Sequence, residues 1–321
     1  DRVSARVLGF TPPMKQPAAG AARVPDEHDA RAYLFMLSSS LAFAVMGALG
    51  HLAGERIDWR LVACARTLLA FVFSAAFALS TGVRLVLFRP AVLWVRSIAG
   101  SLSLLCYFYA VTHLPVSTAI TLSNTVPVWV TLLAWPVLGQ RPALADWLAV
   151  SVGVVGVALV QHPQLGGDAT AAALALASAL GTAVAMLGLN RLGGVDARAV
   201  VTHYSGVSTA FAFGFLLLTR GTAARHGALA EAGTLALLLG VGVVGTLGQL
   251  AMTRAYALGS ASRVSVVGLT QIVFALVLDT LLWRRQFDAL TLAGILLVVA
   301  PSAWLTLRRP LRRGAQIHTT S

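Results

Sequence analysis

The side chains that could do chemistry in this sequence are ionisable or amide groups placed inside long apolar stretches. Asp279 is the only acidic residue well inside such a stretch, and Ser265, Gly268, Gln271 and Ala275 precede it at intervals of three and four residues. This spacing places all five residues on one face of a helix. An ionisable group at this depth in a bilayer costs about 2.5–3.5 kcal/mol on insertion scales, so we expect it to face a partner or water.

Three interpretations of Asp279 are open. The carboxylate could form a buried ion pair with Arg66, which lies at a similar depth in the second apolar stretch, about 9 Å from the outer end. It could instead bind and release the protons that drive a coupled process. The third interpretation is a solvated, inert carboxylate near the lipid headgroups.

Arg96 begins a second polar stripe, which continues through Gly100, Ser103 and Tyr107. An arginine in this place could hold a carboxylate or phosphate through two parallel hydrogen bonds. Alternatively, an arginine near a helix end could extend back along the helix to the lipid phosphates. Both interpretations of Arg96 stay open.

The uncharged candidates for contact with a solute are aromatic or amide side chains within the apolar stretches. They are Tyr107, Asn124, Trp129, Asn190, Gln249 and Gln271. The amides could bind a polar solute in a central cavity or form hydrogen bonds between helices, each worth about 0.6 kcal/mol. Trp129 could be a gate, a cavity wall or a packing residue.

Composition places these groups in a membrane protein. Of the 321 residues, 57% are hydrophobic and only 11% are charged. The net charge of +12 does not indicate nucleic-acid binding, because the arginines are scattered between apolar segments and form no basic face. We therefore expect the lipid bilayer and a small-molecule solute as partners, without nucleic acid.

Apolar segments recur along the chain with short polar connections between them. They cover approximately residues 32–52, 60–80, 91–113, 116–138, 145–161, 171–190, 199–219, 233–257, 261–283 and 290–307. Most are long enough to cross a hydrocarbon layer of about 30 Å as a helix. The predicted fold is an all-α integral membrane protein with ten transmembrane helices. Residues 1–31 are expected to be a disordered tail, and residues 308–321 a basic tail.

The charges of the loops predict the orientation. Most loop arginines fall in the tails or after the second, fourth, sixth and eighth segments, as Arg84, Arg141, Arg191 and Arg263 do. The positive-inside rule then places both termini in the cytoplasm. The abundance of arginine and alanine over lysine suggests a bacterial protein, for which the inner membrane is the expected location.

The two halves of the chain show the same layout. Residues Ala110–Val155 laid over Ala255–Ala300, a shift of 145, align a small-residue corner, a long helix, a polar loop and a glycine-containing helix. Five helices in each half would give the halves opposite orientations, which is typical of transporters. The predicted repeats are residues 32–161 and 171–307.

Residues 93–142 carry a family resemblance. Arg96 and Gly100, the pair Tyr109-Ala110, the corner Leu114-Pro115 and the mid-helix Pro127 match the pattern of the EamA-type members of the drug/metabolite transporter superfamily. Gln140 stands where the family has a glutamate after Gly139. In the second half Ala255 matches, whereas Ile272 replaces the proline and Arg284-Arg285 replace Gly-Glu. The resemblance implies a central cavity lined by both halves, and export of amino acids, other metabolites or drugs.

The leading functional prediction is a transporter that works by alternating access. An integral-membrane enzyme is disfavoured, because the chain contains neither H-E-x-x-H nor G-x-S-x-G. A membrane scaffold or accessory subunit is the third interpretation. No catalytic residue, metal or cofactor is expected, a homodimer is left open, and the sequence does not tell whether Cys64 and Cys106 meet.

Overall fold

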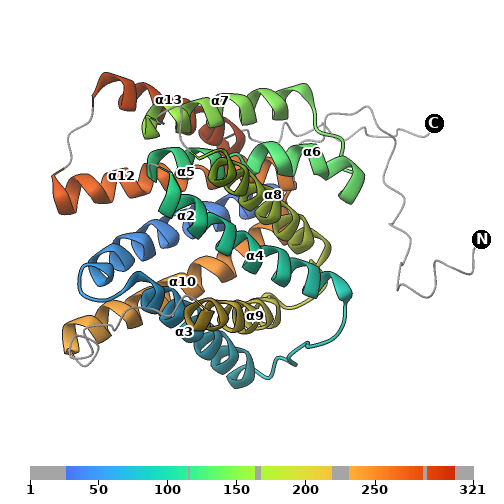
Figure 1. Cartoon of the computed structure of the whole chain (residues 1–321). Coiled ribbons are helices and arrows are strands. Elements are labelled where there is room, and N and C mark those ends of the chain that lie inside the picture. The colour runs from blue at the N-terminus through green and yellow to red at the C-terminus, as the bar shows by residue number, and fades with distance from the viewer. Residues whose placement is uncertain (1–26, 115, 163–167, 219–230, 285–287, 308–321) are drawn as a thin grey trace, which may run out of the picture.

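The computed structural model describes residues 27–114, 116–162, 168–218, 231–284 and 288–307. Within these ranges every regular element is an α-helix (Figure 1). The helices are α2 (Glu27–Gly54), α3 (Trp59–Ser80), α4 (Ala91–His113), α5 (Val116–Ser123), α6 (Val126–Leu138), α7 (Leu144–Gln161), α8 (Ala169–Arg191), α9 (Ala197–Leu218), α10 (Ala232–Leu258), α11 (Ala261–Gly268), α12 (Thr270–Trp283) and α13 (Ala289–Leu307).

The described helices have the length and composition of a multi-pass membrane protein. Eight helical stretches among them are long and apolar enough to cross a bilayer, and Ala91–Tyr107 and Ala289–Leu305 are shorter apolar helices. Most of the two predicted tails lies outside the described residues. Helix α2 nevertheless begins at Glu27, inside the predicted N-terminal tail, because its first turns continue the helix that carries the first apolar segment.

Two predicted helices are broken in the middle. The expected helix over 116–138 divides into α5 and α6 at Asn124-Thr125, and the expected helix over 261–283 divides into α11 and α12 at Leu269. At each break a backbone N–H bonds to the carbonyl three residues back, from Thr125 to Leu122 and from Leu269 to Val266. The predicted stripe from Ser265 to Asp279 therefore does not lie along one regular helix.

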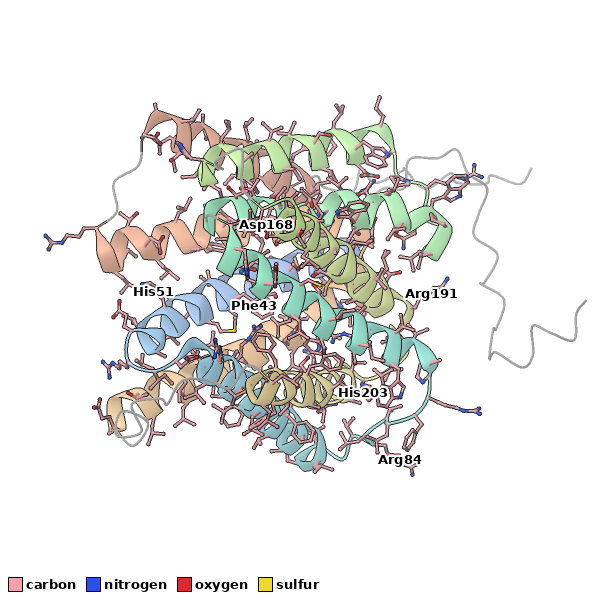
Figure 2. All side chains as sticks on the ribbon, viewed as in Figure 1. Phe43, His51, Arg84, Asp168, Arg191 and His203 are labelled. Atoms are coloured by element: carbon pink, nitrogen blue, oxygen red, sulfur yellow. The ribbon has the colours of Figure 1, made fainter. Side chains whose placement is uncertain are left out.

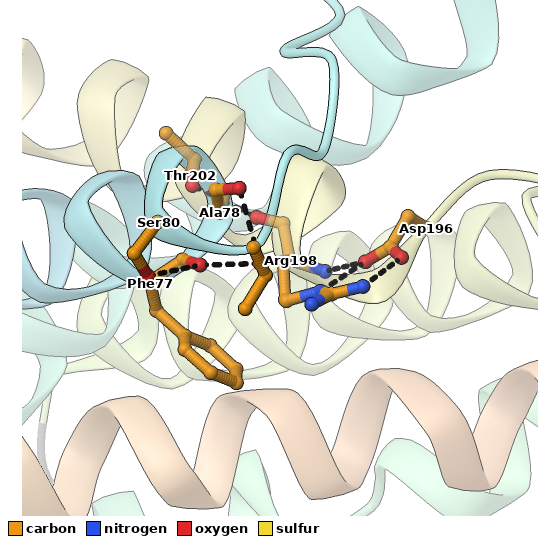
Figure 3. Close-up of polar contacts among 7 residues, drawn as sticks. Phe77, Ala78, Ser80, Asp196, Arg198 and Thr202 are labelled. Carbon is orange, nitrogen blue, oxygen red and sulfur yellow. Dashed lines mark hydrogen bonds and ion pairs between the residues drawn. The ribbon is translucent and has the colours of Figure 1, made fainter.

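Aspartates in the connections begin several helices. The carboxylates of Asp58, Asp168 and Asp196 each accept a hydrogen bond, 2.8 Å long, from the backbone N–H two residues on. Figure 3 shows Asp196 also facing the guanidinium of Arg198, whose hydrogen bonds hold the pKa of Asp196 below its usual value. A carboxylate here satisfies backbone donors that no intrahelical carbonyl can reach. The stabilisation is lost only as the pH falls through that lowered pKa.

Helix packing joins the two halves of the chain. Helix α2 packs along α10, α4 along α8, α3 along α9, and α7 along α13. Figure 1 shows α7 and α13 together along one side of the molecule, with α3, α9 and α10 on the opposite side. Each of these four contacts pairs a helix from before residue 162 with one from after it, so neither half has an apolar core independent of the other.

Glycines allow the closest of these contacts. A Cβ at Gly156 of α7 would lie 2.8 Å from the carbonyl oxygen of Gly294 in α13, and a Cβ at Gly294 would lie 2.7 Å from the carbonyl oxygen of Gly156. Real Cβ atoms do not approach a backbone oxygen this closely. The two helix backbones therefore meet at this pair of glycines, as in other small-residue contacts between membrane helices.

The substitution Gly156→Leu should separate α7 from α13 and destabilise the protein by about 1–3 kcal/mol, the usual effect of overpacking. The measurement is the thermal unfolding midpoint of the purified protein in detergent. Gly47→Leu is the matched control, because a Cβ at Gly47 would meet nothing within 4 Å. Equal midpoints for the two variants would contradict the close contact.

Candidate functional site

The candidate site is built around the two helix breaks, which occupy equivalent positions in the two halves. Thr270 follows Thr125 by the repeat shift of 145 residues. Each hydroxyl donates to a carbonyl three residues back, from Thr125 to Leu122 at 2.6 Å and from Thr270 to Val267 at 2.7 Å. A break in mid-span interrupts the regular hydrogen bonding of the backbone, and such breaks are tolerated where protein or a water-filled space surrounds them.

Polar atoms without partners lie close in sequence to the first break. Ser123 Oγ, Trp129 Nε1 and Thr131 Oγ1 are buried atoms with no hydrogen-bond partner in the described structure. The amide of Asn124 is half-buried and donates to the carbonyl of Ile120 at 2.9 Å. Buried polar groups nearly always have partners. These atoms therefore have hydrogen-bonding capacity that the described residues leave unused, and Trp129 stays a predicted solute contact.

The second half contributes one further buried amide. Gln249 of α10 is only 6% exposed, and its Oε1 has no hydrogen-bond partner in the described part of the chain. Gln271 is exposed, and Tyr107 is half-buried. The structure therefore presents Gln249 as an interior amide with free hydrogen-bonding capacity.

Asn190 differs from the other amides, because its side chain already forms hydrogen bonds with other protein groups. Its Nδ2 donates to the carbonyls of Tyr256 and Gly259 at 2.7 and 3.0 Å, and its Oδ1 accepts from Gln140 Nε2 at 3.2 Å. Gln140 Oε1 in turn accepts from the backbone N–H of Ala261 at 3.4 Å. This network fastens the loop after α6 to the ends of α8 and α10 and the start of α11.

An ion pair lies alongside this network. Asp146 Oδ1 of α7 accepts from Arg263 Nε of α11 at 2.9 Å, and the two side chains are 9% and 24% exposed. Asp146 Oδ2 also accepts from the backbone N–H of Ala143. The sequence prediction treated Arg263 as a loop charge. The partner could not be recognised because Asp146 and Arg263 are far apart in the chain. We call the ion pair and the Gln140–Asn190 contact the latch.

The described residues show no ion pair between Asp279 and Arg66. Both side chains are half-buried. Ion pairs found among the described residues include His51 with Glu55, His162 with Asp288, Arg198 with Asp196 and Arg263 with Asp146. The described contacts therefore do not support a buried Asp279–Arg66 pair, and the pair stays a prediction. Cys64 and Cys106 are both free thiols.

Comparison of the sequence with models of known families shows which family the chain belongs to. The model of the EamA-like transporter family matches the chain twice, over residues 30–161 and 166–307. The chain belongs to the EamA-like transporter family. It is thus a multi-pass membrane transporter, and each EamA unit contains one of the two broken helices.

Curated relatives of this EamA protein are named as transporters rather than enzymes. The pseudopaline exporter CntI of Pseudomonas aeruginosa is 32% identical over 273 residues, which cover 83% of this chain and 93% of that protein. A riboflavin transporter of Rhizobium johnstonii is 30% identical over 198 residues, which cover 61% of this chain and 63% of that protein. A solved crystal structure superposes with a TM-score of 0.75 at 18% identity, over 86% of this chain and 96% of that one, and shows the same fold.

Helix α4 of this EamA protein carries a polar ridge that the sequence prediction did not resolve. Ser97 Oγ lies 2.9 Å from His203 Nδ1, Ser101 Oγ lies 3.0 Å from Ser208 Oγ, and Ser103 Oγ donates to the carbonyl of Ser178 at 2.6 Å. These hydrogen bonds join α4 to α8 and α9. Serines inside apolar segments commonly bond neighbouring helices in this way, so the sequence alone does not tell them from residues that bind a solute.

The substitution Asp146→Asn should remove the negative charge of the latch. It should destabilise the protein by about 1.5–3 kcal/mol, the range for hydrogen bonds to charged groups. A double-mutant cycle with Arg263→Gln, followed by thermal unfolding in detergent, measures the coupling. The matched control is Glu55→Gln, whose partner His51 is 66% exposed, and which should change stability little. Additive effects of the two latch substitutions would contradict the ion pair.

Proposed function

We propose that the protein moves a small polar or amphipathic metabolite across the membrane by alternating access, with two inverted five-helix repeats around a central cavity. One observation carries this proposal: the fourth apolar helix of each repeat is broken at equivalent positions, between α5 and α6 and between α11 and α12. Discontinuous helices at a repeat interface form the solute sites of many transporters. Helices α6 and α11, one from each broken pair, pack against each other.

The pattern of helix contacts supports the two-fold relation between repeats. A shift of 145 residues takes α2 onto α8 and α4 onto α10. The contact of α2 with α10 is therefore the repeat equivalent of the contact of α8 with α4, and both contacts are extensive. Helix α3 packs on its own counterpart α9, and α7 on its own counterpart α13. Ten spans in two units of five would give the units opposite orientations.

The latch supports a conformation in which one end of the cavity is closed. Gln140 and Asp146 belong to the first EamA unit, whereas Asn190 and Arg263 belong to the second. Rocking of one repeat against the other at this end would have to separate these side chains. The repeat equivalents of Asp146 and Arg263 are Thr291 and Thr118, both neutral and both 8% exposed. These two positions therefore carry no ion pair equivalent to Asp146–Arg263.

The orientation proposal rests on the positions of the charged loops. Arg84 and Arg191 lie toward one end of the helices, and His51 lies at the other end (Figure 2). The arginine-rich end, which also carries the latch, is proposed to face the cytoplasm with both termini. The bacterial inner membrane is the proposed location.

The names of relatives indicate the kind of solute. One relative exports pseudopaline and another carries riboflavin, both by name. We infer a metabolite of similar polarity here, an amino acid or a related compound, with export as the direction. The candidate contacts are Asn124, Trp129 and Gln249, with Tyr107 and Gln271 as further candidates. Asp279 is the proposed proton-coupling group, in the half-buried position that the structure gives it.

Counterflow in proteoliposomes tests this function. The full-length protein, loaded with one unlabelled compound at a time, should accumulate the same labelled compound from outside. The panel contains amino acids, riboflavin and pseudopaline, and protein-free liposomes are the blank. Gln249→Leu should raise the half-saturation concentration about 10-fold, because the protein loses one hydrogen bond to the solute. Absence of counterflow for every compound, with correctly folded protein, would refute the proposal.

A further inference from the structure

Arg96 is the most deeply buried charge among the described residues. Its side chain is 1% exposed, although it lies only about a turn and a half from the start of α4. Burial to this degree is incompatible with an arginine that extends to lipid phosphates. Of the two interpretations that the sequence left open for Arg96, the lipid contact is therefore excluded.

Three helices enclose the side chain of Arg96. The guanidinium carbon lies 3.7 Å from the ring centroid of Tyr204 in α9, so the charge rests on the face of an aromatic ring. The stem lies against Gly188 of α8, where an added Cβ would come within 3.0 Å of Arg96 Cβ. The contact of the Arg96 stem with α8 and the contact of the guanidinium with the Tyr204 ring together fix the position of the charge.

The guanidinium has no anionic partner within the described part of the protein. Nε and Nη1 are buried and form no hydrogen bond there. None of the four ion pairs found among the described residues includes Arg96. Tyr204 can contribute attraction to the cation but no negative charge. A buried cation without a countercharge is strongly unfavourable unless something else supplies the charge.

A second arginine lies on a helix that packs against the helix of Tyr204. Arg66 of α3 is half-buried, and α3 packs against α9, the helix that carries Tyr204. Because α9 packs against both α3 and α4, Tyr204 stands between elements that each bring an arginine.

Packing does not require a charge at this position. The repeat equivalent of Arg96 is Val241 of α10, which is also 1% exposed and fills its place with an apolar side chain. The neighbouring glycine is common to both repeats, because Gly100 and Gly245 correspond, and each lies against a side chain of another helix. The fold thus keeps the small residue in both halves and the charge in only one.

We propose that Arg96 is the anion-recognition residue of this transporter and binds a carboxylate or phosphate group of the solute. Tyr204 holds the plane of the guanidinium. This inference rests on the proposed transport function and narrows the solute to an anionic metabolite. The solute's charge neutralises Arg96, so binding should stabilise the protein as well as carry the solute.

Ligand-dependent thermal unfolding of the purified protein in detergent tests the anion site without requiring transport. The probes are L-glutamate, citrate and inorganic phosphate, and L-glutamate dimethyl ester is the probe without carboxylates, all at equal ionic strength. At least one oxyanion should raise the unfolding midpoint saturably, and the ester should not. Arg96→Gln should raise the half-saturation concentration of the oxyanion about 10- to 100-fold. Arg96→Lys should give a value between those of the wild type and Arg96→Gln.

Arg254→Gln is the matched control, because it makes the same change at an exposed arginine and should leave the oxyanion effect intact. Without added anion, Arg96→Gln should unfold at or above the wild-type midpoint, since an uncompensated charge is removed. A purely structural arginine would instead lower that midpoint. If no oxyanion stabilises the wild type more than Arg96→Gln, the anion site is refuted.

Counterflow of the same compounds separates this inference from the transport proposal. Stabilisation by an oxyanion without counterflow of any compound would refute transport and leave the anion site. Counterflow that is equal in the wild type and in Arg96→Gln would overturn the anion site and leave transport. The expected result is carboxylate counterflow whose half-saturation concentration rises about 10- to 100-fold in Arg96→Gln and stays unchanged in Arg254→Gln.

Discussion

A polar group inside a bilayer has to find its partner within the protein or in a space that water can enter, because lipid tails offer none. This constraint organises the whole structure. The backbone satisfies it by forming helices, and the serines of α4 satisfy it by bonding α8 and α9. The acidic residues of the connections satisfy it at helix ends, where Asp58, Asp168 and Asp196 accept backbone donors. The groups that remain unsatisfied are then the informative ones.

Among the described residues these exceptions include neutral groups and a charged one. Ser123 Oγ, Trp129 Nε1 and Gln249 Oε1 are neutral groups, and Arg96 brings a charge. A transporter needs interior groups that exchange partners as a solute enters and leaves, so complete satisfaction by the protein would work against its function. The latch shows the opposite arrangement. There Asp146, Arg263, Gln140 and Asn190 satisfy one another, and they hold the two EamA units together at one end.

The two repeats share a plan but not their chemistry. Thr125 and Thr270 form the same hydrogen bond at the same break, and Gly100 and Gly245 allow close packing at the same place. In contrast, Arg96 corresponds to Val241, and the charged latch residues correspond to threonines. Duplicated packing maintains the fold, whereas these charges are present in one copy alone.

The sequence by itself determined the membrane class, the approximate helix bounds, the 145-residue repeat and the family, because all of these depend on local hydrophobicity and on spacing along the chain. It also pointed to Arg96, Asn124, Trp129 and Gln249 as polar groups in apolar surroundings. Only the tertiary structure decided which of them have partners. Asn190 looked like Gln249 in the sequence, yet its amide is occupied by Gln140, Tyr256 and Gly259, which lie far away along the chain. Whether a buried polar group is satisfied depends on helices that meet in space, and no pattern in a single helix records that.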